Sequence, residues 1–262
     1  MDDIIDLGAF PIHRPDSAQY LELVERCRSA LRRDGMFNLV GFLKPGATER
    51  AVAEIAPVMA NASHLHKRRH NIYFKKEVEG LQPGHPALRL CETINHTVCA
   101  DQLPNSVVVR VYEYPPFIDF LAATMEKPKL FHMADPLARA NVMAYRDGEA
   151  LNWHFDRSEF TTTLLLQSPS QGGAFEYRTS LRSDDDPNYD GVAQLLEGKD
   201  AECRTLDLAA GTLNVFRGKN TAHRVTTVRG ERERIIAVFS FYERPDVQFS
   251  DEERIGFYGR AA

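Results

Sequence analysis

The sequence predicts a mainly β protein with flanking α-helices, and three observations lead to that fold class. Downstream of residue 138, short apolar runs alternate with Gly-containing turn segments such as "SPSQGG" and "TVRGE", and about eight strands in about 105 residues are typical of a jelly roll or a related double-sheet barrel. Upstream of that point, apolar residues recur at helical spacing instead. The chain has 262 residues, of which 43% are apolar and 26% charged, an ordinary composition for a globular protein with a full core.

The N-terminal part is expected to form helices that pack on the outside of the barrel. Asp16 has the sequence features of an N-cap and Gly35 those of a helix end, with apolar residues at helical spacing between them. Thr48 is expected to cap a second helix. The inner face of that helix would consist of Val52, Ile55 and Met59. A shorter helix is expected at 117–125.

The strands are predicted from short apolar runs bounded by turn residues. One short strand is expected at 36–43, between the first two helices. The barrel strands are expected at 140–146, 151–157, 161–167, 173–178, 203–208, 212–217, 222–228 and 232–242. The charged, His-rich stretch 63–86 is expected to be an irregular loop, and the polar insert 179–202 to contain one short helix at 192–196.

We expect residues 1–262 to form a single domain with three parts. Residues 1–138 would form the mixed, partly helical N-terminal part with the His-rich loop. Residues 139–245 would form the jelly-roll core, and residues 246–262 a C-terminal tail.

Charge and composition argue against several classes of protein. The formal net charge is −5, which gives no reason to expect binding to nucleic acid or to a membrane. No stretch approaches the ~18 apolar residues of a transmembrane helix, and the acidic start "MDDIIDLGAFPIHRPD" has too short an apolar run for a signal peptide. The four cysteines are scattered and form no C-x-x-C pair, so we expect reduced thiols and a cytoplasmic location.

A candidate metal site begins with His154 and Asp156 in "NWHFDRSEF". On a strand, residues i and i+2 point to the same face, so the imidazole and the carboxylate can converge on one point. A surface His beside a surface Asp is the simpler alternative. A third ligand is offered by His223, for which a His at a strand start without a special role is again the simpler alternative. Two His and one carboxylate form the facial triad that holds non-haem Fe(II) and leaves coordination positions open.

A candidate anion site lies further on, where Arg232 and Arg234 begin the strand that carries "IIAVFSF". Strand parity places both on the face of Ile236, inside the barrel. An Arg inside a barrel needs an anion, because a buried unpaired charge is very costly, and guanidinium binds carboxylate in a bidentate manner. Tyr145, on the strand that leads to His154, could donate its hydroxyl to the same carboxylate. Alternatively, both arginines lie at a solvated strand end, and this suits Arg232 in particular.

The ordered set of H-x-D, a distal His and an Arg eleven residues after it resembles the iron(II)/2-oxoglutarate-dependent oxygenases, whose core is a double-stranded β-helix. The stretches "YRDGEALNWHFDRSEFTTTLLLQ", "GGAFEY" and "HRVTTVRGERER" look most like one branch, the radical amino-acid halogenases and their hydroxylase relatives. The stretches "RRHNIYF" and "ADPLARANVMAYRDG" extend the likeness upstream. The resemblance covers most of the chain, from about residue 10 to 245.

The resemblance implies roles for individual residues. The implied iron ligands are His154, Asp156 and His223. Arg234 would hold the distal carboxylate of 2-oxoglutarate with Tyr145 as a helper, and Arg232 is the alternative for that ion pair. The implied cofactors are Fe(II), the co-substrate 2-oxoglutarate and O₂.

The residue at position 156 bears on the type of reaction. In the halogenases that this sequence resembles, a small residue replaces the carboxylate of the triad and leaves room for chloride. Asp156 occupies that position here. The resemblance therefore implies hydroxylation of an unactivated C–H bond, with release of succinate and CO₂.

The implied substrate is a free amino acid or a small amino-acid derivative, and several residues are candidates for binding it. If the stretch "RRHNIYF" covers the pocket, the residues that would grip a substrate carboxylate are Arg69, His70 and Asn71. A solvated loop is the alternative for this stretch. Asn152 shares the inward parity of His154 and could contact the substrate. Arg157 could recognise a zwitterion or pair with Glu159 at the pocket mouth.

Other functions fit the same residues. The same chemistry could act on another small metabolite or on a carrier-bound amino acid. A cupin-like protein that binds a metal without turnover belongs to a different class, and formation of succinate would separate it from the enzymes. The sequence indicates a small-molecule partner and leaves the oligomeric state open.

Overall fold

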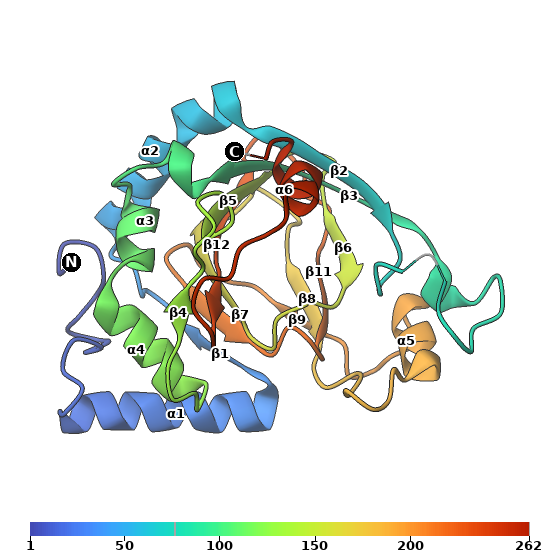
Figure 1. The fold of residues 1–262 in the computed structure, drawn as a ribbon, viewed down its shortest axis with the longest axis horizontal. Helices are drawn as coiled ribbons and strands as arrows, with labels where there is room; N and C mark the ends of the chain where they lie inside the picture. The colour runs from blue at the N-terminus through green and yellow to red at the C-terminus, as the bar shows by residue number, and fades with distance from the viewer. Residues whose placement is uncertain (76, 262) are drawn as a thin grey trace.

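The computed structural model describes residues 1–75 and 77–261, and within them the chain forms thirteen strands and six α-helices. Most strands belong to two antiparallel sheets that face each other as a double-sheet barrel, with helices gathered on the outside (Figure 1). The predicted fold class, mainly β with a jelly-roll core and N-terminal helices outside it, is confirmed.

The larger sheet has seven strands and forms one wall of the barrel. In spatial order they are β1 (Met36–Leu39), β10 (Leu213–Phe216), β7 (Thr161–Gln167), β12 (Arg234–Phe239), β5 (Ala140–Tyr145), β3 (Cys91–Cys99) and β2 (His64–His70). Three of these strands, β1 to β3, come from the N-terminal part of the chain. The expected barrel segment 139–245 is therefore widened on both edges by strands from upstream.

The smaller sheet has four strands and forms the opposite wall. In spatial order they are β6 (Leu151–His154), β11 (Ala222–Val225), β8 (Phe175–Arg178) and β9 (Arg204–Leu206). A two-stranded ribbon pairs β13 (Phe241–Tyr242) with β4 (Phe131–His132). Each barrel strand predicted from the sequence is present, although most are shorter than predicted.

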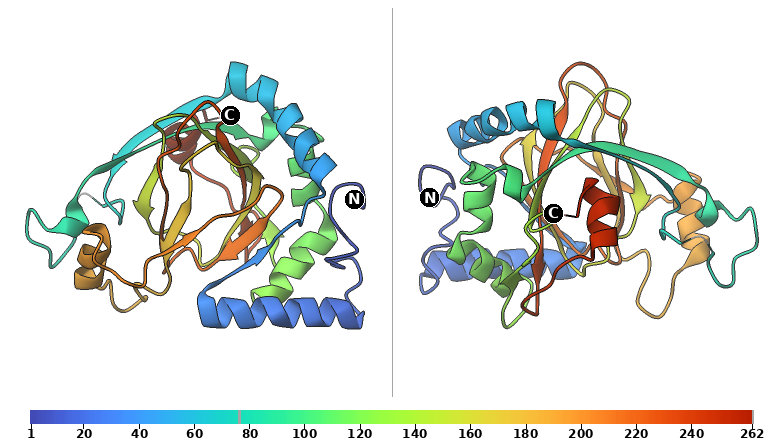
Figure 2. Two further views of the ribbon diagram at one scale, coloured as in Figure 1. Left: turned by 180° about the vertical axis from the view of Figure 1, so that it is seen from behind. Right: turned by 45° about the horizontal axis from the view of Figure 1, so that its top comes forward.

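Helices cover the outer face of the larger sheet. They are α1 (Ala18–Asp34), α2 (Pro45–Ala62), α3 (Val107–Tyr112) and α4 (Pro115–Thr124), and Figure 2 shows that they gather on one side of the barrel. The short helix α5 (Tyr189–Leu196), which contains the predicted 192–196, lies on the other side with the 3₁₀ turn η1 (Pro86–Leu88). A second 3₁₀ turn, η2 (Ala100–Gln102), follows β3.

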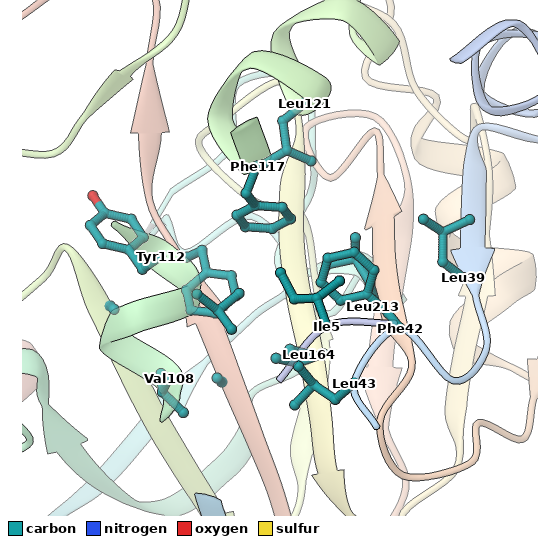
Figure 3. Packing of buried hydrophobic residues seen from close by; sticks show 14 of the residues in the cluster. Ile5, Leu39, Phe42, Leu43, Val108, Tyr112, Phe117, Leu121, Leu164 and Leu213 are labelled. Atoms are coloured by element: carbon teal, nitrogen blue, oxygen red, sulfur yellow. The ribbon is translucent and has the colours of Figure 1, made fainter. Parts of the chain in front are cut away.

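The main hydrophobic core lies between these helices and the larger sheet. Phe117 and Leu121 of α4 and Leu164 and Leu213 of the sheet are each fully buried, and Figure 3 shows them interdigitating with side chains from the N-terminal segment. Burial of each such side chain contributes roughly 1.5–3 kcal/mol. The barrel interior is therefore not needed as the main core and can hold polar side chains.

Two of the expected helix starts differ from the structure. Ser17, not Asp16, is the N-cap of α1, and its hydroxyl accepts a hydrogen bond from the Tyr20 amide at 3.2 Å. Helix α2 begins at Pro45, three residues before Thr48, because the fixed φ of Pro suits the first helical position. The expected C-terminal residue of α1, Gly35, has a φ of 72° and ends that helix as predicted.

The expected loop at 63–86 is wrong in its first part, because residues 64–70 form strand β2. This strand pairs along its whole length with β3, which the sequence also failed to predict. The side chains of β2 alternate between half-buried and exposed. Both faces are polar, since its inner face borders a cavity instead of the apolar core.

The expected tail at 246–262 contains a further helix, α6 (Asp251–Tyr258). Ser250 and Glu253 form a reciprocal capping box at its start. Asp135 is fully buried and fixes this segment, because its carboxylate accepts hydrogen bonds from Arg254 Nε at 2.8 Å and from the Phe249 amide at 3.0 Å. Helix α6 thereby packs beside β2 and β3, as Figure 1 shows.

Two further expectations concern membranes and cysteines. Among the described residues, no helix combines the length and apolarity needed to cross a membrane. All four cysteines carry free thiols, as predicted.

Candidate active site

A cavity of about 310 Å³ lies inside the barrel, between the two sheets. Strands of both sheets line it, and α6 and the segment before it contribute Phe249, Phe257 and Tyr258. The cavity brings together the three predicted metal ligands and two of the residues predicted to bind 2-oxoglutarate. They are His154, Asp156, His223, Arg234 and Tyr145.

Two neighbouring strands of the smaller sheet place the two histidines side by side. His154 of β6 lies directly opposite His223 of β11 in the antiparallel register, with ring centroids 4.1 Å apart. Asp156 follows the end of β6. Its carboxylate oxygens lie 3.3 Å from His154 Nε2 and 3.4 Å from His223 Nε2. One ligand atom from each of the three residues therefore lies within 4.8 Å of the others.

Backbone carbonyl groups fix the tautomer of both histidines. Nδ1 of His154 lies 2.8 Å from the carbonyl oxygen of Asn152, and Nδ1 of His223 lies 2.9 Å from that of Thr221. A carbonyl oxygen only accepts, so each Nδ1 carries the proton and each Nε2 presents a lone pair to the cavity. Anchoring of the second ring nitrogen is what orients histidine ligands in metal sites.

His154 and Asp156 already favour the protonation states that a divalent metal requires, whereas His223 must release a proton when the metal binds. Burial, with a smaller contribution from His223, lowers the pKa of His154 and favours its neutral form. Burial alone would raise the pKa of Asp156, but His223 and His154 hold it well below its usual range. Burial would lower the pKa of His223, and the Asp156 carboxylate outweighs burial and raises it. A metal ion that replaced the proton between these groups would satisfy the same carboxylate.

The carboxylate of Asp156 is itself held in place. Its Oδ2 accepts a hydrogen bond from the Thr161 hydroxyl, and its backbone amide donates to the Gly218 carbonyl oxygen at 3.1 Å. A Cβ atom at position 218 would lie 2.4 Å from Asp156 Oδ2, closer than any side chain can approach. Position 218 thus requires Gly so that this carboxylate can face the two histidines.

These donors fit a divalent transition metal. Two neutral imidazole nitrogens and one carboxylate oxygen form one face of a coordination sphere, and this set is diagnostic of non-haem Fe(II) sites with open positions. The three residues lie on one wall of the cavity, so the open positions would face its interior.

Arg234 lies on the opposite wall of the cavity, at the start of β12 in the larger sheet. It is 3% exposed, and its Nη1 atom has no hydrogen-bond partner among the described residues. Burial lowers the pKa of Arg234 to about 10, and the guanidinium stays charged at neutral pH. A buried cation without a counter-ion is costly, so this position fits the carboxylate of a bound molecule such as 2-oxoglutarate.

Tyr145 is paired directly with Arg234 across β5 and β12. It is 1% exposed, and its hydroxyl is within 3.7 Å of the Met143 sulfur, a weak acceptor. Burial raises the pKa of Tyr145 to about 12, so the hydroxyl keeps its proton and can donate it in a hydrogen bond. The structure therefore places both residues that were predicted to bind 2-oxoglutarate side by side in the cavity wall.

Arg232 is exposed and does not line the cavity, which argues against it as the alternative anion-binding residue. The parity argument fails for it because β12 starts at Arg234. Residue 232 lies in the preceding turn, where residues two apart need not share a face.

Of the three residues predicted to bind substrate on the His-rich stretch, one lines the cavity. His70 lines it, but both ring nitrogens have protein partners, the Asn71 carbonyl oxygen at 3.0 Å and the Thr93 hydroxyl at 2.8 Å. The Asn71 side chain bonds the backbone of the following turn, including the amides of Tyr73 and Lys75.

The third residue, Arg69, is exposed and lies on the outer face of β2. Its neighbour Arg68 faces the cavity with His66 and His70. The sequence interpretation missed Arg68 because the stretch was taken for a loop, in which alternate residues need not point to the same side. Period-two alternation in "HLHKRRH" was the signal that could have identified it.

The other two predicted substrate residues also differ from expectation. Asn152 does not line the cavity, because its side-chain amide donates to the Glu92 carbonyl oxygen of β3. Arg157 lines the cavity mouth, but it pairs with Glu253 of α6 at 2.6 Å and not with Glu159. Glu159 pairs instead with Lys127 at 2.7 Å.

The double-sheet barrel, the His-Asp-His triad and the buried arginine facing it define an iron(II)/2-oxoglutarate-dependent oxygenase. Within this class, the family model described as "HalD: Halogenase D" matches residues 20–254, and the chain belongs to that family. The predicted superfamily is confirmed, and Fe(II), 2-oxoglutarate and O₂ are the cofactors of this class of enzyme. No curated protein sequence matches the chain.

Solved structures show the same fold at low sequence identity. HygX from Streptomyces hygroscopicus, with nickel, 2-oxoglutarate and hygromycin B bound, is similar with a TM-score of 0.58 and 12% identity, over 86% of this chain and 89% of that one. AviO1 from Streptomyces viridochromogenes is similar with a TM-score of 0.57 and 15% identity, over 86% of this chain and 97% of that one. A prolyl-4-hydroxylase from Pseudomonas putida is similar with a TM-score of 0.52 and 15% identity, over 84% of this chain and 99% of that one.

Proposed function

We propose that this protein hydroxylates an unactivated C–H bond of an amino acid or a small amino-acid derivative, with release of succinate and CO₂. The observation that carries the proposal is the buried guanidinium of Arg234, whose Nη1 has no partner among the described residues, on the cavity wall opposite three converging ligand atoms. A cupin-like protein that only binds a metal has no use for such a cation, whereas a dicarboxylate co-substrate supplies its counter-ion.

Each residue of the triad has a defined task in this proposal. His154, Asp156 and His223 would hold the metal through Nε2, a carboxylate oxygen and Nε2. When bound, Fe(II) and 2-oxoglutarate supply the oxidising power by reductive activation of O₂, a chemistry that belongs to the cofactors. The protein fixes the ligands, orients both reactants and keeps the reacting centre inside a closed barrel.

Arg234 and Tyr145 would orient the co-substrate. The walls around them are apolar, with Leu208, Val225 and Ile236 among the lining residues. In such surroundings a charge-assisted bond between guanidinium and carboxylate is little screened by water. This part of the cavity would therefore determine the affinity for 2-oxoglutarate, as the triad determines that for the metal.

Asp156 supports hydroxylation over halogenation, despite the description of the family as halogenases. A halide needs a coordination position that a carboxylate at residue 156 would fill. Thr161 and the close approach of Gly218 hold this carboxylate toward the two histidines. A second anion beside it would also be repelled.

Arg68 supports a substrate that carries a carboxylate. It lies on the cavity face of β2, toward the entrance, and forms no hydrogen bond or ion pair with another described residue. The similar HygX structure contains a small molecule, hygromycin B, together with nickel and 2-oxoglutarate. A small-molecule substrate fits a cavity of about 310 Å³ in the present chain.

The proposal is tested by a product screen in the presence of excess chloride. Protein loaded with Fe(II) under anaerobic conditions is mixed with 2-oxoglutarate, air and a panel of amino acids and their N-acyl derivatives. We expect products heavier by one oxygen atom, formed together with succinate, and no chlorinated product. Asp156→Gly should lose most hydroxylation because it removes a ligand and a charge. Chlorinated product from the unaltered protein would overturn the hydroxylase assignment.

A further inference from the structure

The charged groups around the cavity do not balance, and the imbalance bears on the substrate. Among the described residues that line it, Asp156 is the only carboxylate, whereas three arginines line it. These are Arg68, Arg157 and Arg234. A bound substrate must fit this surplus of positive charge, because charges near a low-dielectric cavity are poorly screened.

Two of the three arginines have an assigned counter-ion. Arg157 pairs with Glu253 at 2.6 Å, and under the proposed function Arg234 pairs with 2-oxoglutarate. Taken together, the positive charges of Fe(II) and Arg234 offset the negative charges of the 2-oxoglutarate dianion and Asp156. Arg68 is thus the cation that remains without a partner once both cofactors are bound.

The surroundings of Arg68 offer no compensation. Its guanidinium lies over the Phe74 ring, 4.8 Å from the centroid, which is a weak contact. Burial, followed by repulsion from Arg157, lowers the pKa of Arg68. Burial also lowers the pKa of the neighbouring His66, so this imidazole is neutral at neutral pH.

The remaining polar wall near Arg68 is neutral, and much of its hydrogen-bonding capacity is already used. Asn95 Nδ2 donates to the Thr97 hydroxyl at 2.8 Å, and the Tyr258 hydroxyl donates to Asn141 Oδ1 at 3.0 Å. Among the described residues that line the cavity, a substrate ammonium group would find no carboxylate other than the metal-binding Asp156. Burying an ammonium group without a counter-charge costs several kcal/mol, so the cavity disfavours it.

We propose that the substrate is a net anion: a carboxylate bound by Arg68 on a molecule without an uncompensated ammonium group. Two kinds of amino-acid derivative have this chemistry, N-acylated amino acids and amino acids with an acidic side chain. The inference rests on the proposed function and narrows its substrate class. Zwitterionic and cationic free amino acids are thereby excluded as the preferred substrates.

The test compares molecules that differ mainly in charge. The protein is loaded with Fe(II) and 2-oxoglutarate without O₂, and dissociation constants are measured by calorimetry. Three probes share one carbon skeleton: N-acetyl-L-norleucine is an anion, L-norleucine a zwitterion and L-lysine a cation. L-glutamate and L-glutamine form a second pair and separate the two kinds of anion. We expect the anion of at least one set to bind about tenfold more tightly than its partners, as for one charge-assisted hydrogen bond.

Matched variants assign the preference to one side chain. Arg68→Gln should abolish the preference for the anion, and Arg68→Lys should retain part of it. Arg69→Gln is the control, because Arg69 lies next to Arg68 on the outer face of the same strand. The inference is overturned if no anion binds more tightly than its zwitterionic partner, or if Arg68→Gln keeps the preference.

Failure of this inference can be distinguished from failure of the proposed function. Binding of 2-oxoglutarate to the Fe(II)-loaded protein is followed separately, by the visible absorption band that such a complex produces. If no band appears, the proposed function fails. If the band appears and zwitterions bind as tightly as anions, only the substrate class is wrong.

Discussion

The inner wall of the cavity and its entrance are built in different ways. The inner wall consists of barrel strands, which place His154, His223 and Arg234 in a fixed hydrogen-bonded register. The entrance is formed by β2, an edge strand that pairs with β3 along its whole length, and by α6, a peripheral helix that makes few contacts with the barrel besides the pair of Arg157 with Glu253. The inner wall thus has the rigidity that the cofactors need, whereas the entrance is the part that can vary with the substrate.

The largest effect is expected from a change in the inner wall. His223→Ala should abolish metal binding and reduce succinate formation to background, because two donors cannot replace the facial set of three. Metal content after dialysis and succinate yield are the measurements, with circular dichroism to verify the fold. His13→Ala, in the N-terminal segment, is the control. Turnover at the wild-type rate in His223→Ala would contradict the assignment of the three residues as metal ligands.

A second large effect should appear on the opposite side of the inner wall. Arg234→Ala should raise the KM for 2-oxoglutarate by about 30-fold or more, since loss of a buried charge-assisted partner costs at least about 2 kcal/mol. Arg232→Ala should change this KM little, because Arg232 is exposed. Steady-state kinetics with varied 2-oxoglutarate would show the contrast, and a larger effect from Arg232→Ala would reverse the assignment.

The smallest effect is expected at the entrance. Glu253→Gln removes the ion pair with Arg157, whose side chain is 69% exposed, and such exposed pairs contribute about 0.2–1 kcal/mol. Substrate KM should therefore change by less than about fivefold, with the KM for 2-oxoglutarate unaltered. Gln still accepts the capping hydrogen bond from Ser250, and Glu252→Gln controls for loss of charge on α6. An effect on 2-oxoglutarate binding would show that entrance and inner wall are coupled.

The same division explains what the sequence could predict. The barrel strands could be predicted from the sequence, because apolar runs separated by Gly-containing turns mark them. The inner-wall residues could be proposed because H-x-D, His and Arg follow one another in a fixed order. Strand β2 could not be predicted, since its inner residues His66 and Arg68 border the cavity and its outer residues contact solvent. A strand without an apolar face gives no hydrophobic alternation.

Helices α3 and α6 were not predicted from the sequence, for different physical reasons. The sequence "VVVRVY" of α3 is rich in β-branched residues, which favour strands, and the cap at Ser106 and tertiary packing override that preference. Helix α6 had a readable signal, the capping box of Ser250 and Glu253. The pairing of Arg157 with that helix could not be predicted from the sequence, since the partners are 96 positions apart.

The carbonyl oxygens that bind Nδ1 of His154 and His223 also have a thermodynamic consequence. Both rings are immobilised by the fold itself, so their conformational entropy is lost when the chain folds and not when a metal arrives. Metal association then orders little of the protein, and its free energy appears almost entirely as affinity. Protein treated with a chelator should accordingly keep its secondary structure, in contrast to small zinc domains, for which metal binding and folding are one event.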